Sequence, residues 1–213
     1  MAAVIFNSTL ISLLLLSVYY NVGEFPDLTV YDFTDPTQID EASAAYKTYV
    51  TNLSGIAFMF SNQLSFSASI NVLLQVPLQA PVMKRELANK MYSPTAYFLG
   101  RFLSNMIIQI FYPMIMILIL FWNLGIDTSQ DNFLWLCAFG LMGNFIYCGQ
   151  GYFIGIVVSD PGSAKLANLM VIMVMFCTNG VLCNMDSASA FIKFISTYSP
   201  SRYNCEGFFR RMI

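Results

Sequence analysis

Histidine is absent from this chain of 213 residues, which excludes a Ser-His-Asp triad, a histidine-ligated metal centre and imidazole acid–base catalysis. No G-x-x-x-x-G-K-[ST] stretch occurs, so the chain carries no recognisable ATPase phosphate-binding loop. The five cysteines show no C-x-x-C spacing, which argues against zinc and thioredoxin-like sites. We therefore predict no catalytic residue, metal ligand or cofactor site in this chain.

Charge is also scarce. Charged residues make up 10% of the chain and hydrophobic residues 57%, whereas a soluble domain carries about 25% charged residues. Charge-free runs cover residues 1–23, 48–83, 102–126, 132–159 and 166–185. Each run can supply the roughly 20 residues that a helix needs to cross about 30 Å of hydrocarbon. The sequence thus predicts an all-α, multi-pass integral membrane protein with spans at about 3–23, 49–76, 94–122, 132–158 and 163–185.

The first run has no basic n-region and no A-x-A-like cleavage site before Gly23. We therefore predict a true span rather than a signal peptide, and expect that it belongs to a longer protein.

The loops differ in the sign of their charge. Segment 24–47 holds six acidic residues against one lysine, whereas segment 77–101 holds four basic residues against Glu86 alone. The positive-inside rule places segment 77–101 in the cytoplasm and the acidic loop outside. Alternation then predicts an exoplasmic or re-entrant tail at 186–213, where four basic residues run against the rule. The net charge of −2, with no other basic stripe, argues against a nucleic-acid partner.

Two proline steps mark helix starts. Ser93-Pro94 and Asp160-Pro161 each place a capping side chain before a proline whose missing N–H is tolerated at the first helical position.

In the exoplasmic regions Cys183 and Cys205 could form a disulfide, or both could be free thiols.

Small residues recur every four positions in the second span, at Ala57, Ser61, Ser65 and Ser69. This spacing favours close helix packing, because small side chains let two backbones approach in lipid. A polar stripe facing a substrate is the alternative. Gly151 and Gly155 in the fourth span favour packing in the same way.

The residues from Val82-Met83-Lys84-Arg85-Glu86 through Tyr92-Ser93-Pro94 to Leu99-Gly100-Arg101 resemble the cytoplasmic loop and third helix of the G subfamily (White/PDR-like) of ABC transporters. Val158-Ser159-Asp160-Pro161 and Ser199-Pro200-Ser201-Arg202-Tyr203 resemble later elements of the same family, in the same order. The chain departs from the family pattern at Gln79, Ala80, Met83, Lys90 and Ser93.

This resemblance implies that residues 1–213 form most of a six-helix exporter membrane domain, without its sixth span or its ATPase domain. The family's short cytoplasmic coupling helix would lie at 77–92 and dock on the ATPase domain, which would bind ATP and Mg²⁺. The residues implied in this coupling are Lys84, Arg85, Glu86 and Tyr92. A solvated charge cluster that only fixes topology is the alternative interpretation.

The resemblance also implies a substrate path between spans two and five. It points to Phe66 and Ser69 facing Met173 and Phe176, with Val181 and Leu182 at an apolar plug. The alternative is that these side chains pack or face lipid. Implied partners are membrane lipid, the ATPase domain and a second membrane domain in a homo- or heterodimer.

Three functions remain open from the sequence. The first is the membrane part of an ATP-driven exporter of lipids, sterols or amphipathic molecules, working by alternating access. The second is a non-transporting scaffold or assembly subunit with the same fold. The third, an ion-coupled carrier or channel, is disfavoured because the predicted spans contain no acidic residue and consist mainly of charge-free runs.

Overall fold

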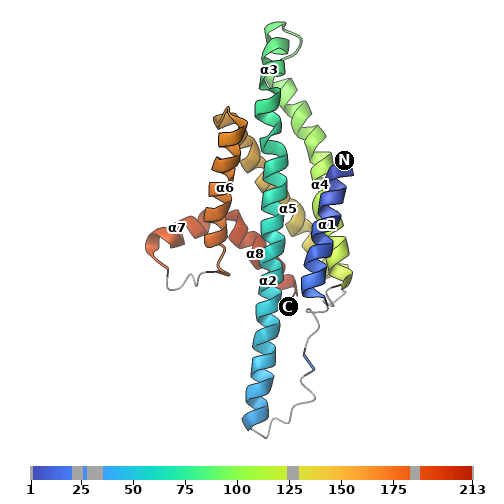
Figure 1. Ribbon diagram of the computed structural model, residues 1–213, viewed down its shortest axis with the longest axis vertical. Coiled ribbons are helices and arrows are strands. Elements are labelled where there is room, and N and C mark those ends of the chain that lie inside the picture. The colour runs from blue at the N-terminus through green and yellow to red at the C-terminus, as the bar shows by residue number, and fades with distance from the viewer. Residues whose placement is uncertain (1, 21–25, 28–35, 124–129, 183–187, 213) are drawn as a thin grey trace.

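The computed structural model describes residues 2–20, 26–27, 36–123, 130–182 and 188–212 (Figure 1). These residues form helices joined by short turns, and no strand occurs among them. The helices are α1 (Ala2–Tyr19), α2 (Pro36–Leu73), α3 (Gln75–Ala88), α4 (Pro94–Asn123), α5 (Gln130–Val157), α6 (Pro161–Cys177), α7 (Ala190–Tyr198) and α8 (Pro200–Met212). The predicted all-α fold is confirmed.

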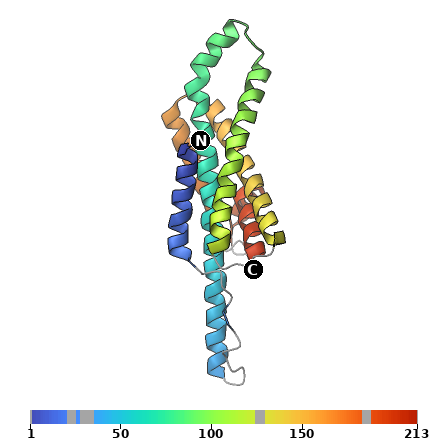
Figure 2. The same ribbon diagram turned by 90° about the vertical axis from the view of Figure 1, so that its right-hand side faces the viewer.

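Helix α2 forms the long axis of the molecule. Its 38 residues correspond to about 57 Å at 1.5 Å per residue, roughly twice the thickness of the hydrocarbon layer. The end that carries Asp40, Glu41 and Lys47 extends past the other helices, and α3 continues beyond the opposite end (Figures 1 and 2). The predicted span 49–76 is therefore the middle of a much longer helical rod.

Among the described residues, α4 and α5 are the two helices long and apolar enough to cross a membrane by length and composition. Helix α6 and residues 9–19 of α1 are apolar but shorter. Helix α6 ends at Cys177, eight residues before the predicted end of its span at 185. Gly180 follows with φ of 90°, a left-handed conformation that α-helix cannot contain, and Asn179 Oδ1 accepts from the Val181 amide 3.1 Å away.

The predicted proline starts are confirmed. Ser93 Oγ accepts a hydrogen bond from the Ala96 amide at 3.2 Å, and Asp160 Oδ2 accepts one from the Ser163 amide at 2.7 Å. The second bond, from the Ser163 backbone, lowers the pKa of Asp160. Both turns are thus fixed by the residue before the proline.

The core lies where α2, α4, α5 and α8 meet. Leu64, Tyr112, Tyr147 and Phe208 are almost fully buried there. Phe60 of α2 meets Phe208 of α8 edge to face, with ring centroids 4.5 Å apart. The sequence predicted only a tail at 186–213, but its second half folds as α8 into the core, while α7 runs across the end of α6 (Figure 1).

The small-residue pattern packs α2 against α5. Ser61, Ser65 and Ser69 are buried, and a β-carbon at Gly151 would lie 2.5 Å from the carbonyl oxygen of Ser69. A β-carbon at Gly155 would lie 2.9 Å from the carbonyl oxygen of Leu73. Two backbones can approach this closely only where side chains are minimal, so the packing interpretation is confirmed.

Candidate functional site

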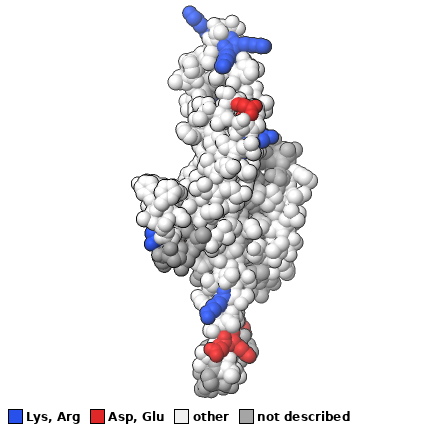
Figure 3. Space-filling view, turned by 60° about the vertical axis from the view of Figure 1, so that its left-hand side comes forward, with Lys and Arg blue, Asp and Glu red and all other residues white. Residues whose placement is uncertain are grey.

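Charge is separated along the molecule. Basic side chains gather at the α3–α4 end, and acidic side chains lie near the opposite tip of α2 (Figure 3). No residue of α3 is buried, and Lys84 and Arg85 are exposed on it. Neither forms an ion pair with any residue that the structure describes. Both cations are therefore free to meet an acidic partner from outside the chain.

The turn between α3 and α4 is held by Glu86 and Tyr92. The Tyr92 hydroxyl donates a hydrogen bond to the Glu86 carboxylate, and its ring stacks on Tyr97 with centroids 5.5 Å apart and planes 10° apart. Lys90 sits between them with φ of 53°, in the left-handed region that ends a helix sharply. Two of the four predicted coupling residues thus brace the turn, while Lys84 and Arg85 face solvent.

The hydrogen bond to Glu86 raises the pKa of Tyr92 to about 12, from an ordinary value near 10. Because the folded-state pKa is the higher one, the bond stabilises the turn fully below pH 10 and is lost as the pH rises through about 12. We expect the difference in tyrosinate absorbance between the parent protein and Tyr92→Phe to show one titration near pH 12. Glu86→Gln should return this midpoint toward 10, and a midpoint that stays near 12 in that variant would contradict the assigned cause.

A polar contact that the sequence did not reveal joins α3 to the spans. Asn105 of α4 donates from Nδ2 to Gln75 Oε1 and to the Tyr152 hydroxyl, each at 2.7 Å. Gln75 opens α3 and Tyr152 belongs to α5, so one amide connects three helices. An asparagine inside an otherwise apolar helix was the available signal, because such residues form interhelical hydrogen bonds in membranes.

The residues predicted to line the substrate path differ in their contacts and in their exposure. Phe66 of α2 meets Phe176 of α6 with ring centroids 5.4 Å apart. Ser69 is completely buried, and its Oγ accepts from Asn168 Nδ2 at 3.0 Å. Met173 is 48% exposed on the surface of α6. The structure therefore brings Phe66 and Phe176 into contact and places Ser69 in the packed seam.

The predicted plug residues, Val181 and Leu182, follow the end of α6 and are exposed. Cys205 is a buried free thiol in α8. Its possible disulfide partner, Cys183, lies outside the described residues, and the free thiol at Cys205 agrees with the alternative in which no disulfide forms.

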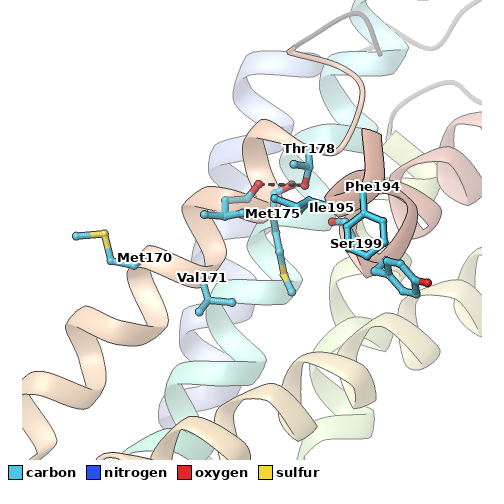
Figure 4. A pocket seen from close by; sticks show the side chains of 9 residues that line it. Met170, Val171, Met175, Thr178, Phe194, Ile195 and Ser199 are labelled. Atoms are coloured by element: carbon cyan, nitrogen blue, oxygen red, sulfur yellow. Dashed lines mark hydrogen bonds between the residues drawn. The ribbon is translucent and has the colours of Figure 1, made fainter. Parts of the chain in front are cut away.

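A cavity of about 660 Å³ lies between α6 and α7 (Figure 4). Thr178, at its wall, donates to the carbonyl oxygens of Val174 and Met175 at 3.0 and 3.2 Å, so its hydroxyl is satisfied. The other lining residues are mostly apolar or aromatic: Met170, Val171, Val174, Met175, Phe194, Ile195, Tyr198 and Ser199. Apolar walls of this size suit the hydrocarbon part of a small molecule, and methionine adapts to irregular shapes.

Comparison with known proteins shows similarity to ABC transporters. The family model described as ABC-2 type transporter matches residues 1–212. The chain is 25% identical over 158 residues to "Protein white" of Ceratitis capitata and 26% identical over 161 residues to "Protein white" of Drosophila melanogaster. It is 21% identical over 143 residues to "ABC transporter G family member 21" of Arabidopsis thaliana.

These alignments cover 74%, 74% and 67% of the chain, but 23%, 23% and 21% of the respective relatives. The chain thus spans less than a quarter of the length of the curated relatives it matches.

Proposed function

Because this chain belongs to the ABC-2 type transporter family and matches its G-subfamily members, we propose that it is the membrane-spanning part of an ATP-driven exporter of lipids, sterols or other amphipathic molecules. The family match across residues 1–212 is the observation that carries the proposal. We take α1, α2, α4, α5 and α6 as the membrane-crossing helices of this integral membrane protein.

The energy for transport would come from an ATPase domain outside this chain. We propose that α3 is the helix that contacts this domain, since Lys84 and Arg85 are exposed and can pair with acidic groups. The Glu86–Tyr92 bond keeps the far end of α3 at a fixed angle to α4. Asn105 then passes a displacement of α3 to α4 and α5. ATP and Mg²⁺ would be held by the partner domain.

Two features support a transport path for amphipathic molecules in a dimer. The aromatic contact between α2 and α6, where Phe58 and Phe66 both meet Phe176, offers apolar surface at the centre of the helices. The exposed apolar side of α6, which includes Leu166, Met170 and Met173, offers surface for a second membrane domain. We propose that a homo- or heterodimer encloses the transport path between such faces and works by alternating access.

Transport by the full-length protein tests this proposal. After reconstitution in proteoliposomes, we expect a fluorescent short-chain phospholipid or sterol to move across the bilayer with ATP but not with ADP. Phe176→Ala should lower the rate by several-fold, because it removes the ring that joins Phe58 and Phe66 of α2 to α6 beside the proposed path. Phe153→Ala, which truncates a 69% exposed ring on α5, is the matched control and should transport normally.

Absence of ATP-dependent movement for every amphipathic probe would overturn the exporter proposal. If ATPase activity also failed to co-purify with the protein, the scaffold function would take its place.

A further inference from the structure

A second cavity, of about 630 Å³, lies at the α3–α4 end of the molecule. It shares no lining residue with the cavity between α6 and α7. Its walls come from α3, α4 and α5. Most of them are apolar or aromatic, including Val76, Met83, Phe98 and Ile156. The cavity is thus open to a hydrocarbon chain at the edge of the predicted third span.

One charged side chain lines this cavity. Arg101 is half-buried, and it forms neither an ion pair nor a hydrogen bond with any residue that the structure describes. No acidic residue is among the lining residues. A guanidinium that is partly removed from water without a counter-charge is costly, and it pairs best with a phosphate or carboxylate through bidentate hydrogen bonds.

Several of the other polar groups of the cavity are already engaged. Asn105 bonds Gln75 and Tyr152, and the Tyr97 hydroxyl donates to Gln79 at 3.4 Å. The cavity therefore offers one unpartnered cation above apolar walls. That arrangement matches an amphiphile with an anionic head and a hydrocarbon tail.

The surroundings favour a lipid of the cytoplasmic leaflet. Segment 75–105 carries four basic residues, among them the exposed Lys84, Arg85 and Lys90, against Glu86, whose carboxylate accepts the hydrogen bond of Tyr92. Beside the cavity, Phe98 and Leu99 are 46% and 59% exposed, as expected for side chains that meet hydrocarbon. Basic pockets between membrane helices on the cytoplasmic side bind anionic lipid head groups.

We propose that the cavity between α3, α4 and α5 binds an anionic glycerophospholipid, whose head-group phosphate pairs with Arg101 and whose acyl chain lies along Phe98 and Ile156. The site is distinct from the proposed substrate path. A lipid bound here touches α3 and the Asn105 contact at once. It would hold the connecting helix against the spans.

Native mass spectrometry of the full-length protein in detergent tests the proposal, with dioctanoyl phosphatidylserine and dioctanoyl phosphatidylcholine as probes. Phosphatidylserine should bind at least about tenfold more tightly, because the choline ammonium of phosphatidylcholine neutralises its phosphate and leaves no net negative charge for Arg101. Arg101→Gln should abolish this preference. Lys90→Gln removes the same charge from the exposed turn outside the cavity and should preserve it.

A second pair of variants tests the cavity itself. Ala80→Phe fills it and should weaken binding of phosphatidylserine, whereas Ala88→Phe places the same ring on the exposed end of α3 and should not. Equal binding of the two lipids, or unchanged preference in Arg101→Gln, would overturn the proposal. Competition by inorganic phosphate as strong as that of the lipid would also overturn it, in favour of a free-anion site. Binding is measured without ATP, so a failure of the transport proposal leaves this test intact.

Discussion

Gly151→Leu is expected to prevent correct folding, because the crossing of α2 and α5 has no room for a side chain at this position. The β-carbon alone would lie 2.5 Å from the Ser69 carbonyl oxygen and 3.0 Å from its α-carbon. Both are backbone atoms of a fully buried residue of α2, so neither can move aside by a change of rotamer. The graded variant Gly151→Ala should lower the free energy of unfolding by about 1–3 kcal/mol, as overpacking does in cores.

Gly149 provides the control on the same helix. A β-carbon there meets no atom within 4 Å. Gly149→Ala should be neutral or stabilising by up to about 1 kcal/mol, since alanine favours helix over glycine. Thermal unfolding of the full-length protein in detergent measures both variants, at about 2–4 °C for each kcal/mol in a domain of this size. Equal midpoints for the two alanine variants would contradict the close approach of α2 and α5.

Lys84→Glu with Arg85→Glu is expected to uncouple ATP hydrolysis from transport in the full-length protein. The two residues are exposed on a helix without buried side chains, so reversing their charge should leave the fold of this chain intact. Against an acidic partner, however, the change converts attraction into repulsion, and disrupted interface charge pairs cost about 2–5 kcal/mol. We expect transport to fall by about tenfold or more while ATP turnover continues.

Lys47→Glu is the control for reversing the charge of an exposed lysine elsewhere on the molecule. Lys47 is exposed in the first third of α2, on the side that the charge pattern places outside the cell or in a lumen. Its reversal should leave both ATP turnover and transport unchanged. Parallel assays of the two activities in proteoliposomes measure these variants. Normal transport in the double variant would rule out the coupling role and leave the basic cluster as a determinant of topology alone.

Local sequence patterns determined much of this protein. Hydropathy and the scarcity of charge predicted an all-helical membrane fold, because a helix that crosses lipid must satisfy its backbone internally and present apolar side chains. The steps at Ser93-Pro94 and Asp160-Pro161 gave two helix starts, since capping depends on neighbouring residues only. The spacing of Ser61, Ser65 and Ser69 indicated close packing correctly, without showing which helix would fill the seam.

Helix α8 shows where sequence reasoning stopped. Its residues include Arg202, Asn204, Arg210 and Arg211, so its composition gives no sign of burial. In the structure Phe208 is 1% exposed against α2 and α5, and Asn204 lies where a β-carbon at Gly143 would touch it. A polar helix can enter a helical core only if partners on other helices receive its side chains, and those partners are distant in sequence.

The sequence by itself thus determined the helical class and the resemblance to ABC transporters, and it predicted a cytoplasmic basic loop, because these depend on composition, charge and short motifs. Tertiary structure alone decided that Gly151 meets Ser69, that Asn105 ties α3 to α4 and α5, and that Arg101 lies over an apolar cavity. Each of these depends on contacts between helices that are dozens of residues apart. Such contacts arise from the packing of complete helices, so a local pattern can mark a residue as a contact but cannot name its partner.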